Sequence, residues 1–171
     1  HSIGEFTAAH LAGVLNLEDA LRIVAVRGRL ISELPSGSML AVRMPVEKVY
    51  EILPDKLAIG AINSNQFCVV SGTKEDIANF KHELDSQDIP NKLLVTSHAF
   101  HSFMMDPILD AFRIELEKIK YSTPQLPIIS TATGTWLTET EAASPMYWVN
   151  QLKNTVRFAD AMDTAFELED F

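Results

Sequence analysis

Ser2 lies where a serine nucleophile would be expected, two residues before a glycine and at the start of a predicted helix. A nucleophilic serine needs an exposed Oγ on a tight turn and a backbone N–H directed at the oxyanion that forms during the reaction. The strand-to-helix elbow G-x-S-x-G meets both needs, because its glycines relieve crowding around the serine. Gly4 supplies the second glycine, and the first would lie one residue before His1. The pattern indicates a covalent nucleophile, and the alternative is an ordinary turn or helix start.

A histidine that could activate this serine lies in the segment S-H-A-F-H-S, residues 97–102. His101 follows the last expected strand of the central region, at a junction between two parts of the chain where clefts form. It could act as the general base for Ser2 or form an ordinary interfacial hydrogen bond. His98 and His101 are three residues apart, but without further Cys or His nearby they predict no metal site. Asp106 is a possible third member of a triad, although a backbone carbonyl can orient an imidazole equally well.

Arg27 lies on the apolar face of a predicted helix, at helical spacing from Ala20, Ile23 and Val24. A guanidinium on a face directed at the core is costly unless an anion pairs with it. Two interpretations stay open. Arg27 forms a structural ion pair or extends its charge to solvent, or it binds the carboxylate of a substrate through two parallel hydrogen bonds.

The composition narrows the classes of function. The 171 residues carry 14 Lys and Arg against 23 Asp and Glu, a formal net charge of −9. This balance argues against a nucleic-acid-binding protein or a basic membrane-surface helix. The single cysteine, Cys68, rules out an intrachain disulfide framework and a multi-cysteine zinc site. No apolar run approaches the roughly 18 residues that a membrane span needs, and a cytoplasmic protein is expected.

Three parts of the chain differ in pattern: residues 1–36, 37–97 and 98–171. The first is expected to be mostly helical, with Asn16 as the N-cap of its second helix. The second part is expected to follow the ferredoxin-like order strand, helix, strand, strand, helix, strand, at 38–44, 46–53, 57–62, 67–70, 74–85 and 92–96. The third is expected to contain helices at 107–119, 145–152 (N-capped by Ser144) and 159–167, and a short buried strand at 127–130.

Four motifs, in order, resemble the malonyl-type acyltransferase family, which includes acyltransferase domains of modular polyketide synthases and the malonyl-CoA:acyl-carrier-protein transacylases of fatty-acid synthesis. H-S-I-G-E at residues 1–5 resembles the nucleophile motif G-H-S-x-G-E, and Arg27 lies at the family's spacing after the serine. H-A-F-H at 98–101 resembles the signature of malonyl-selecting polyketide synthase domains. Residues 147–158 resemble the late stretch Y-W…Q-L…N-P-V-R-F, with Thr155 where proline is usual.

The resemblance implies an α/β fold with two lobes. Residues 1–36 and 98–171 would form a partial α/β-hydrolase-like lobe, the first segment containing the nucleophile elbow and the second returning to it. Residues 37–97 would form an inserted ferredoxin-like (βαββαβ) lobe.

The same resemblance assigns roles to individual residues. Ser2 would accept the acyl group with His101 as its base, and Arg27 would bind the free carboxylate of the extender unit. The region of Gln151 would orient His101 through a main-chain carbonyl. Phe100 occupies the position linked to substrate choice, where a bulky ring leaves less room for an α-methyl group and favours malonyl over methylmalonyl.

Two further residues are expected at the site. The Ile3 N–H would be one donor to the oxyanion, and Asn63 falls in a turn that resembles A-x-N-G-P and approaches the site. The implied reaction moves a malonyl unit from malonyl-CoA, through a Ser2 ester, to the phosphopantetheine thiol of an acyl carrier protein in polyketide biosynthesis. No bound cofactor is expected. The expected partners are malonyl-CoA, the carrier protein and neighbouring synthase domains, with no nucleic acid and no membrane.

Two other functions stay open. A serine hydrolase or thioesterase would share the nucleophile and the histidine, and a catalytically inactive synthase fragment would share the fold. The family has further strands and helices before the nucleophile and a closing segment after the late motif, and neither is found in this sequence. We therefore expect an internal fragment, truncated at both ends, with weak or no activity by itself.

Overall fold

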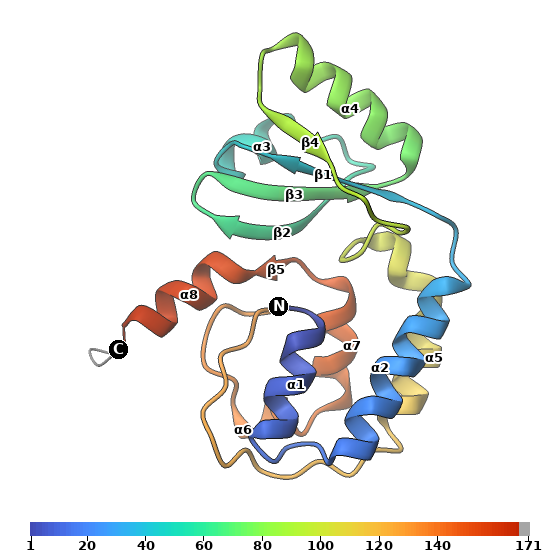
Figure 1. Ribbon diagram of the computed structural model, residues 1–171, viewed down its shortest axis with the longest axis vertical. Coiled ribbons are helices and arrows are strands. Elements are labelled where there is room, and N and C mark those ends of the chain that lie inside the picture. Colours follow the sequence, from blue (N-terminus) through green and yellow to red (C-terminus); the bar gives the residue numbers. More distant parts are fainter. Residues whose placement is uncertain (168–171) are drawn as a thin grey trace.

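A computed structural model describes residues 1–167 of the 171-residue chain. The described residues form two lobes, one containing a sheet covered by helices and the other built of helices (Figure 1). The chain begins in the helical lobe, crosses into the sheet lobe after α2 (Leu17–Ser32), and returns after β4 (Asn91–Leu93). We call residues 38–93 the small lobe and the remainder of the described chain the large lobe.

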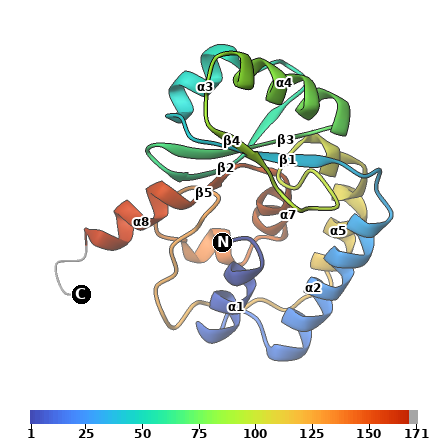
Figure 2. The same ribbon diagram turned by 45° about the horizontal axis from the view of Figure 1, so that its top comes forward.

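The small lobe contains its elements in the order that the sequence predicts, although several ends differ by one to three residues. These are β1 (Ser38–Val42), α3 (Val46–Ile52), β2 (Ala58–Ser64), β3 (Phe67–Gly72), α4 (Lys74–Ser86) and β4. The strands are antiparallel in the order β4-β1-β3-β2. Both helices lie on one face of this sheet (Figure 2).

The two faces of the small-lobe sheet have different roles, because successive side chains of a strand point to opposite faces. One face and the two helices form a closed apolar core that includes Leu40, Val42, Val70, Ile77 and Phe80. The opposite face carries a smaller apolar cluster directed at the large lobe, made of Met39, Ala61, Val69 and Val156. The sheet is therefore buried on one side and is available to line a site on the other.

A bulge in β2 directs Ala61 to that second face. Ile59 pairs with Val70 and Ala61 pairs with Val69, so Gly60 has no partner on β3. One extra residue shifts the side chains that follow it to the other face of the sheet. Ile59 and Ala61, two residues apart, consequently lie in different apolar clusters.

A fifth strand joins the sheet from the large lobe. β5 (Val156–Arg157) pairs in parallel with β2, with Ala61 opposite Val156 and Ile62 opposite Arg157. This strand could not be predicted from the sequence, because two residues are too short to show a periodic pattern. The lobes therefore share one sheet in the order β4-β1-β3-β2-β5.

The large lobe packs most of its helices around one apolar core. They are α1 (Ile3–Leu11), α2, the 3₁₀ segment η1 (Phe103–Ile108), α5 (Leu109–Leu116), α6 (Glu139–Ala142) and α7 (Pro145–Lys153). Phe6, Ile23, Phe112 and Trp148 are buried at the centre of this core. The last helix, α8 (Phe158–Phe166), lies instead beside β2, and its Phe158 packs against the apolar cluster on the sheet. The predicted cap of α2 is confirmed, since the Asn16 side chain accepts a hydrogen bond of 2.8 Å from the Asp19 N–H.

Several predicted elements of the third part differ in the structure. Residues 127–130 form no strand, and Ile129 makes an isolated bridge with Trp136, because the described part of this lobe holds no sheet for a strand to join. The helix predicted at 107–119 is split into η1 and α5, with Pro107 inside the 3₁₀ turn. Ser144 precedes α7, but its side chain makes no capping hydrogen bond.

Other expectations about the large lobe stay predictions. Its α/β-hydrolase-like character is one of them, since the described residues place helices there and no separate sheet. The end of the predicted third part, residues 168–171, lies outside the described residues. Within residues 1–167 no helix is both long and apolar enough to cross a membrane.

Candidate active site

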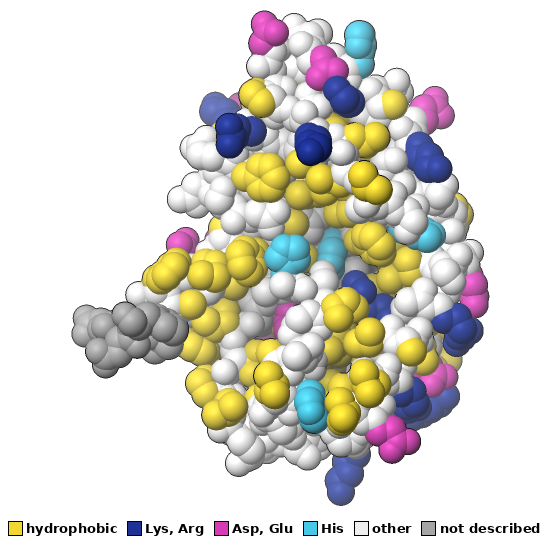
Figure 3. All heavy atoms as spheres, in the orientation of Figure 1, with side chains coloured by type: hydrophobic (Ala, Val, Ile, Leu, Met, Phe, Trp, Pro, Cys, Tyr) yellow, Lys and Arg dark blue, Asp and Glu magenta, His cyan; other side chains and the backbone are white. Residues whose placement is uncertain are grey.

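A cleft of about 360 Å³ lies between the lobes and contains most of the residues singled out from the sequence. The large lobe contributes polar and charged groups, and the small-lobe sheet contributes an apolar wall. Figure 3 shows histidine and hydrophobic side chains gathered where the two lobes meet. The cleft is lined by His1, Ser2, Ile3, Arg27, Met39, Ala61, Asn63, Val69, Leu94, Phe100, His101 and Val156.

Ser2 lies on a sharp turn directly before α1. Its backbone has φ 51° and ψ −102°, a conformation that L-residues rarely adopt and that persists only where the surroundings hold it. The Gln151 side chain is one such restraint, because its Nε2 donates a hydrogen bond of 2.8 Å to the Ser2 carbonyl. The turn presents Ser2 Oγ to the cleft at the N-terminus of a nine-residue helix. A serine with a strained backbone at the start of a helix is what the predicted nucleophile elbow requires on its helix side.

His101 contacts Ser2 across 99 residues of sequence, its Nε2 in hydrogen-bond contact with Ser2 Oγ. Its Nδ1 lies 2.9 Å from the carbonyl oxygen of Asn154. A carbonyl only accepts, so Nδ1 carries the proton and Nε2 is left to accept the proton of Ser2. His101 also has a positive φ of 54°, which places it on a turn rather than in a regular element.

The surroundings keep the His101 imidazole neutral. Burial lowers its pKa to about 4, and the positive charge of Arg27 adds to this effect. The carbonyl oxygens of Asn154 and Gln151 act in the opposite direction but are weaker influences. At neutral pH the ring is therefore neutral, and its unprotonated Nε2 can accept the proton of the serine hydroxyl.

Arg27 is buried and charged but has no counter-ion among residues 1–167. The side chain lines the cleft, the residue is 6 % exposed, and its Nε has no hydrogen-bond partner within the described chain. Burial lowers its pKa to about 10, so it stays protonated at neutral pH. A buried cation without an anion is unfavourable, and a bound carboxylate would remove the penalty. Of the two interpretations of Arg27, the structural ion pair has no support in the described residues.

Three other predicted residues also border the cleft. Ile3 lies at the first position of α1, where its N–H cannot bond within the helix. Phe100 is half-buried and packs against both the large-lobe core and the apolar cluster on the sheet. Asn63 lines the cleft from near the end of β2, and its Oδ1 is buried without a partner in the described chain.

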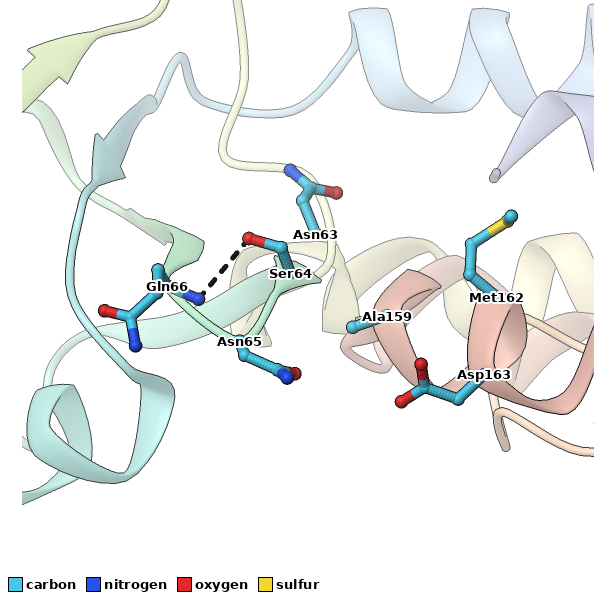
Figure 4. Close-up of a pocket in the computed structure, with 7 residues that line it drawn as sticks. All are labelled: Asn63, Ser64, Asn65, Gln66, Ala159, Met162 and Asp163. Carbon is cyan, nitrogen blue, oxygen red and sulfur yellow. Dashed lines mark hydrogen bonds between the residues drawn. The ribbon is translucent and has the colours of Figure 1, made fainter. Parts of the chain in front are cut away.

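Asn63 also borders a more open groove beside the cleft. Figure 4 shows the groove between the end of β2, which carries Asn63, and α8, which carries Met162 and Asp163. The backbone N–H of Gln66 donates to Ser64 Oγ at 3.4 Å, which ties the β2–β3 turn together. This groove has a volume of about 310 Å³.

Comparison with known proteins identifies the family. The model of the acyl transferase domain matches residues 1–170. The chain belongs to the acyl transferase domain family. Among curated relatives, this acyltransferase chain is 36 % identical over 163 residues to a phenolphthiocerol/phthiocerol polyketide synthase of Mycobacterium tuberculosis, covering 95 % of the chain and 11 % of the relative. It is 41 % identical over 172 residues to polyketide synthase GfsB of Streptomyces halstedii, and this match covers 98 % of the chain and 3 % of GfsB.

Solved structures show the same fold. The acyltransferase chain superposes on the acyl transferase domain of SpnD, in complex with 2-(pent-4-yn-1-yl)malonyl, with a TM-score of 0.94 and 36 % identity, over 99 % of this chain and 41 % of that one. For malonyl CoA-acyl carrier protein transacylase from Burkholderia pseudomallei the TM-score is 0.88 and the identity 28 %, and the superposition covers 98 % of this chain and 59 % of the transacylase. The chain thus spans part of each relative that it matches.

The structure refines the expectations about the residues around His101. The main-chain carbonyl that lies 2.9 Å from His101 Nδ1 is that of Asn154, three residues after Gln151, and the side chain of Gln151 holds the Ser2 carbonyl. Asp106 is not a third member of a triad, because it pairs with Lys153 at 2.7 Å on the surface. His98 lies outside the cleft lining, with its Nε2 3.2 Å from the Leu34 carbonyl.

Sequence reasoning missed a buried polar network behind the elbow. Glu5, in the first turn of α1, is 4 % exposed, and its Oε2 accepts from the N–H and hydroxyl of Thr131 at 3.2 and 2.6 Å. The Tyr147 hydroxyl contacts Glu5 Oε1 and lies 2.6 Å from Ser130 Oγ. The network ties the helix that follows Ser2 to residues about 126 to 142 positions later. Helical spacing could have placed Glu5 on the inner face of α1, but its partners are visible only in the fold.

Proposed function

We propose that this chain provides the acyltransferase site that moves a malonyl unit from malonyl-CoA to an acyl carrier protein in polyketide biosynthesis. The observation that carries the proposal is Arg27, a buried cation without a counter-ion in the described chain that shares a cleft with the Ser2–His101 pair. An acyl group that ends in a carboxylate satisfies both features, because its thioester reaches Ser2 while its far end neutralises Arg27.

The first half-reaction follows from the tautomer of His101. Its Nε2 takes the Ser2 proton as Oγ attacks the thioester carbonyl carbon, and the Nδ1–H to Asn154 stays in place throughout. The Ile3 N–H and the N-terminus of α1 stabilise the oxyanion. When the carbon–sulfur bond breaks, the proton passes from Nε2 to the sulfur of coenzyme A, and the malonyl group remains as a Ser2 ester.

The second half-reaction reverses this sequence with another thiol. The phosphopantetheine thiol of the carrier protein gives its proton to His101 Nε2 and attacks the ester carbonyl. The proton then returns to Ser2 Oγ as the carbon–oxygen bond breaks. Arg27 holds the acyl unit by its carboxylate during both steps, which favours transfer to a positioned thiol over random attack by water.

The carboxylate would also strengthen the base. The charge of Arg27 is one of the causes that lower the pKa of His101 to about 4. Burial is the larger cause, but a bound carboxylate would cancel the charge of Arg27, so the pKa of His101 would rise and the imidazole would become a better proton acceptor. Binding of the proper substrate would in this way activate the histidine.

Phe100 supports the choice of malonyl as the extender unit. Its ring lines the cleft and packs against both lobes, so it has little freedom to move aside for an α-methyl branch. Exclusion of one methyl group from such a pocket is worth about 1–3 kcal/mol. We therefore expect malonyl to be preferred over methylmalonyl by about one to two orders of magnitude.

Covalent loading tests the proposed function. The protein is incubated separately with malonyl-CoA, methylmalonyl-CoA and acetyl-CoA, and the acyl adduct is read from the intact mass. Malonyl-CoA should load fastest, and Ser2→Ala should abolish loading. Ser86→Ala is the matched control, because Ser86 Oγ donates to the Glu83 carbonyl on α4, outside the cleft.

Two results would contradict the proposal. Equal loading by malonyl-CoA and methylmalonyl-CoA would remove the argument from Phe100. A folded protein that loads from none of the thioesters, both as this chain and within a longer synthase chain, would refute the acyl transfer itself. Hydrolysis without transfer to a carrier-protein thiol would favour the serine hydrolase alternative.

A further inference from the structure

The bulge of β2 lies against the backbone that carries His101. A Cβ atom added to Gly60 would collide with Ser71 Oγ and would lie 3.3 Å from the carbonyl oxygen of Phe100. That oxygen belongs to the peptide unit joining Phe100 to His101. The small lobe therefore contacts the histidine segment at a point where a side chain has no room.

The same bulge holds a second segment, which carries the orienting carbonyl. Thr155 Oγ1 donates a hydrogen bond of 2.7 Å to the carbonyl of Ile59, the residue before the bulge. The next residue, Val156, pairs in parallel with Ala61, the residue after the bulge. Three consecutive residues of β2 thus touch both chain segments that meet in the His101–Asn154 hydrogen bond.

The Asn154 carbonyl is not fixed by the helix that precedes it. Asn154 is the exposed C-cap of α7, with φ −71° and ψ 156°, an extended conformation. Its N–H still donates to the Asn150 carbonyl at 2.8 Å, but its own carbonyl points out of the helix toward Nδ1 of His101. Because that carbonyl shares a peptide unit with Thr155, the anchoring of Thr155 decides where the oxygen points.

We propose that Thr155 is a positioning residue for the proposed Ser2–His101 pair. Its hydroxyl holds the Asn154 carbonyl against the bulged strand, and this carbonyl keeps the proton of His101 on Nδ1. The small lobe is then part of the support of the histidine, in addition to forming the apolar wall of the cleft. This inference rests on the proposed role of His101 as the base of Ser2.

A purely structural tie between the lobes is the competing explanation. It predicts that loss of the hydroxyl lowers stability and leaves the chemistry of His101 unchanged. The positioning role predicts a change in the imidazole itself, because an Nδ1–H without a fixed acceptor shares its proton with Nε2. The ring tautomer therefore separates the two explanations, and it requires neither substrate nor turnover.

The test compares three substitutions at this position with a matched control. Thr155→Val removes the hydroxyl and keeps the branched shape, whereas Thr155→Ser keeps the hydroxyl and removes the methyl group. Thr155→Ala removes both. Thr164→Val is the control, because Thr164 Oγ1 also donates a hydrogen bond to a backbone carbonyl, that of Gly134 at 2.6 Å. Thr164 and Gly134 both lie outside the cleft lining.

Two measurements are made on each variant. Nitrogen-15 NMR of the imidazole rings reports the tautomer, and the His101 signals are assigned among the five histidines by their loss in His101→Asn. The rate at which phenylmethanesulfonyl fluoride modifies Ser2 reports whether Nε2 is a competent base, independently of malonyl recognition. Melting temperatures show that each variant is folded.

We expect the parent protein, Thr164→Val and Thr155→Ser to show the Nδ1–H tautomer and similar modification rates. In Thr155→Val the tautomers should be mixed and the rate should fall about ten-fold, a fraction of the ~10²–10⁴-fold that a positioned base contributes. If Thr155→Val does not fold, Thr155→Ala takes its place as the variant that lacks the hydroxyl. The inference then predicts mixed tautomers and slower modification in Thr155→Ala but not in Thr155→Ser.

An unchanged tautomer and rate in the folded variant that lacks the hydroxyl would overturn the inference. A parent protein that shows the Nδ1–H tautomer but loads no malonyl, both as this chain and within a longer synthase chain, would instead contradict the proposed function. The two failures are therefore distinguishable.

Discussion

Replacement of Arg27 by methionine should convert a malonyl-selective site into one that no longer recognises the carboxylate. Methionine keeps an unbranched apolar stem of similar reach, so the packing of α2 against the large-lobe core is preserved while the charge is lost. We expect malonyl loading to fall sharply and acetyl loading to stay constant or increase. The difference arises because acetyl-CoA has no carboxylate to place against residue 27.

The magnitude follows from the burial of the side chain. Arg27 is 6 % exposed and has no anion in the described chain, so a bound carboxylate would form a largely desolvated pair with it. Breaking such a pair by removing one partner costs about 3–5 kcal/mol. At the lower limit this corresponds to a loss of about two orders of magnitude in malonyl loading. The acetyl reaction gains a smaller benefit, because removing the charge of Arg27 raises the pKa of His101 and strengthens the base.

Loading rates of both thioesters, read by intact mass at equal concentrations, give the selectivity directly. Arg22→Met on the same helix is the matched control, because Arg22 is partly exposed and pairs with Asp19 at 3.1 Å and Glu115 at 3.7 Å away from the cleft. The control should leave the ratio of malonyl to acetyl loading unchanged. An equal fall of both rates in Arg27→Met would refute the reasoning, since it would assign Arg27 to the fold or to the histidine rather than to the substrate.

Two other predictions concern the histidine and the buried network. The pKa of His101 is lowered to about 4, below the value of about 6.5 in an unfolded chain, so the free energy of unfolding should decrease as the pH falls from about 6.5 to about 4. Chemical unfolding across this window should show the slope, and a His101→Asn variant that keeps the full slope would contradict it. Glu5→Gln places an amide among the donors of Thr131 and Tyr147 and should lower the free energy of unfolding by about 2 kcal/mol. The control is Glu18→Gln, exposed in the first turn of α2, which should change the free energy of unfolding little. Equal effects of the two substitutions on chemical unfolding would contradict the role of the network.

The local structure of the small lobe could largely be predicted from the sequence. Its strands alternate or form short apolar runs, and α4 shows Ile77, Phe80 and Leu84 on one face, all buried in the structure. Such patterns follow from the periods of 2 and 3.6 residues, which a single segment displays without its neighbours. The bulge at Gly60 left no comparable signal, because it is defined by pairing with β3.

The large lobe was harder to predict for the same reason. Asn16 could be identified as a cap because its partner, Asp19, lies three residues away. A strand at 127–130 would need a neighbouring strand to pair with. In the described residues its only pairing is an isolated bridge between Ile129 and Trp136. β5 exists because β2 lies beside it, and no property of Val156 and Arg157 alone requires a strand.

The sequence by itself determined which residue types were available for chemistry. Ser2, Arg27 and His101 could be selected because a nucleophile, a buried cation and a base are recognisable from side-chain chemistry and short motifs. The tertiary structure decided how they work together. It placed His101 on Ser2 across 99 residues, left Arg27 without a counter-ion in the described chain, and gave His101 the carbonyl of Asn154. Every residue carries the same backbone carbonyl, so which one orients the histidine is settled by three-dimensional position and cannot be read from the side chains.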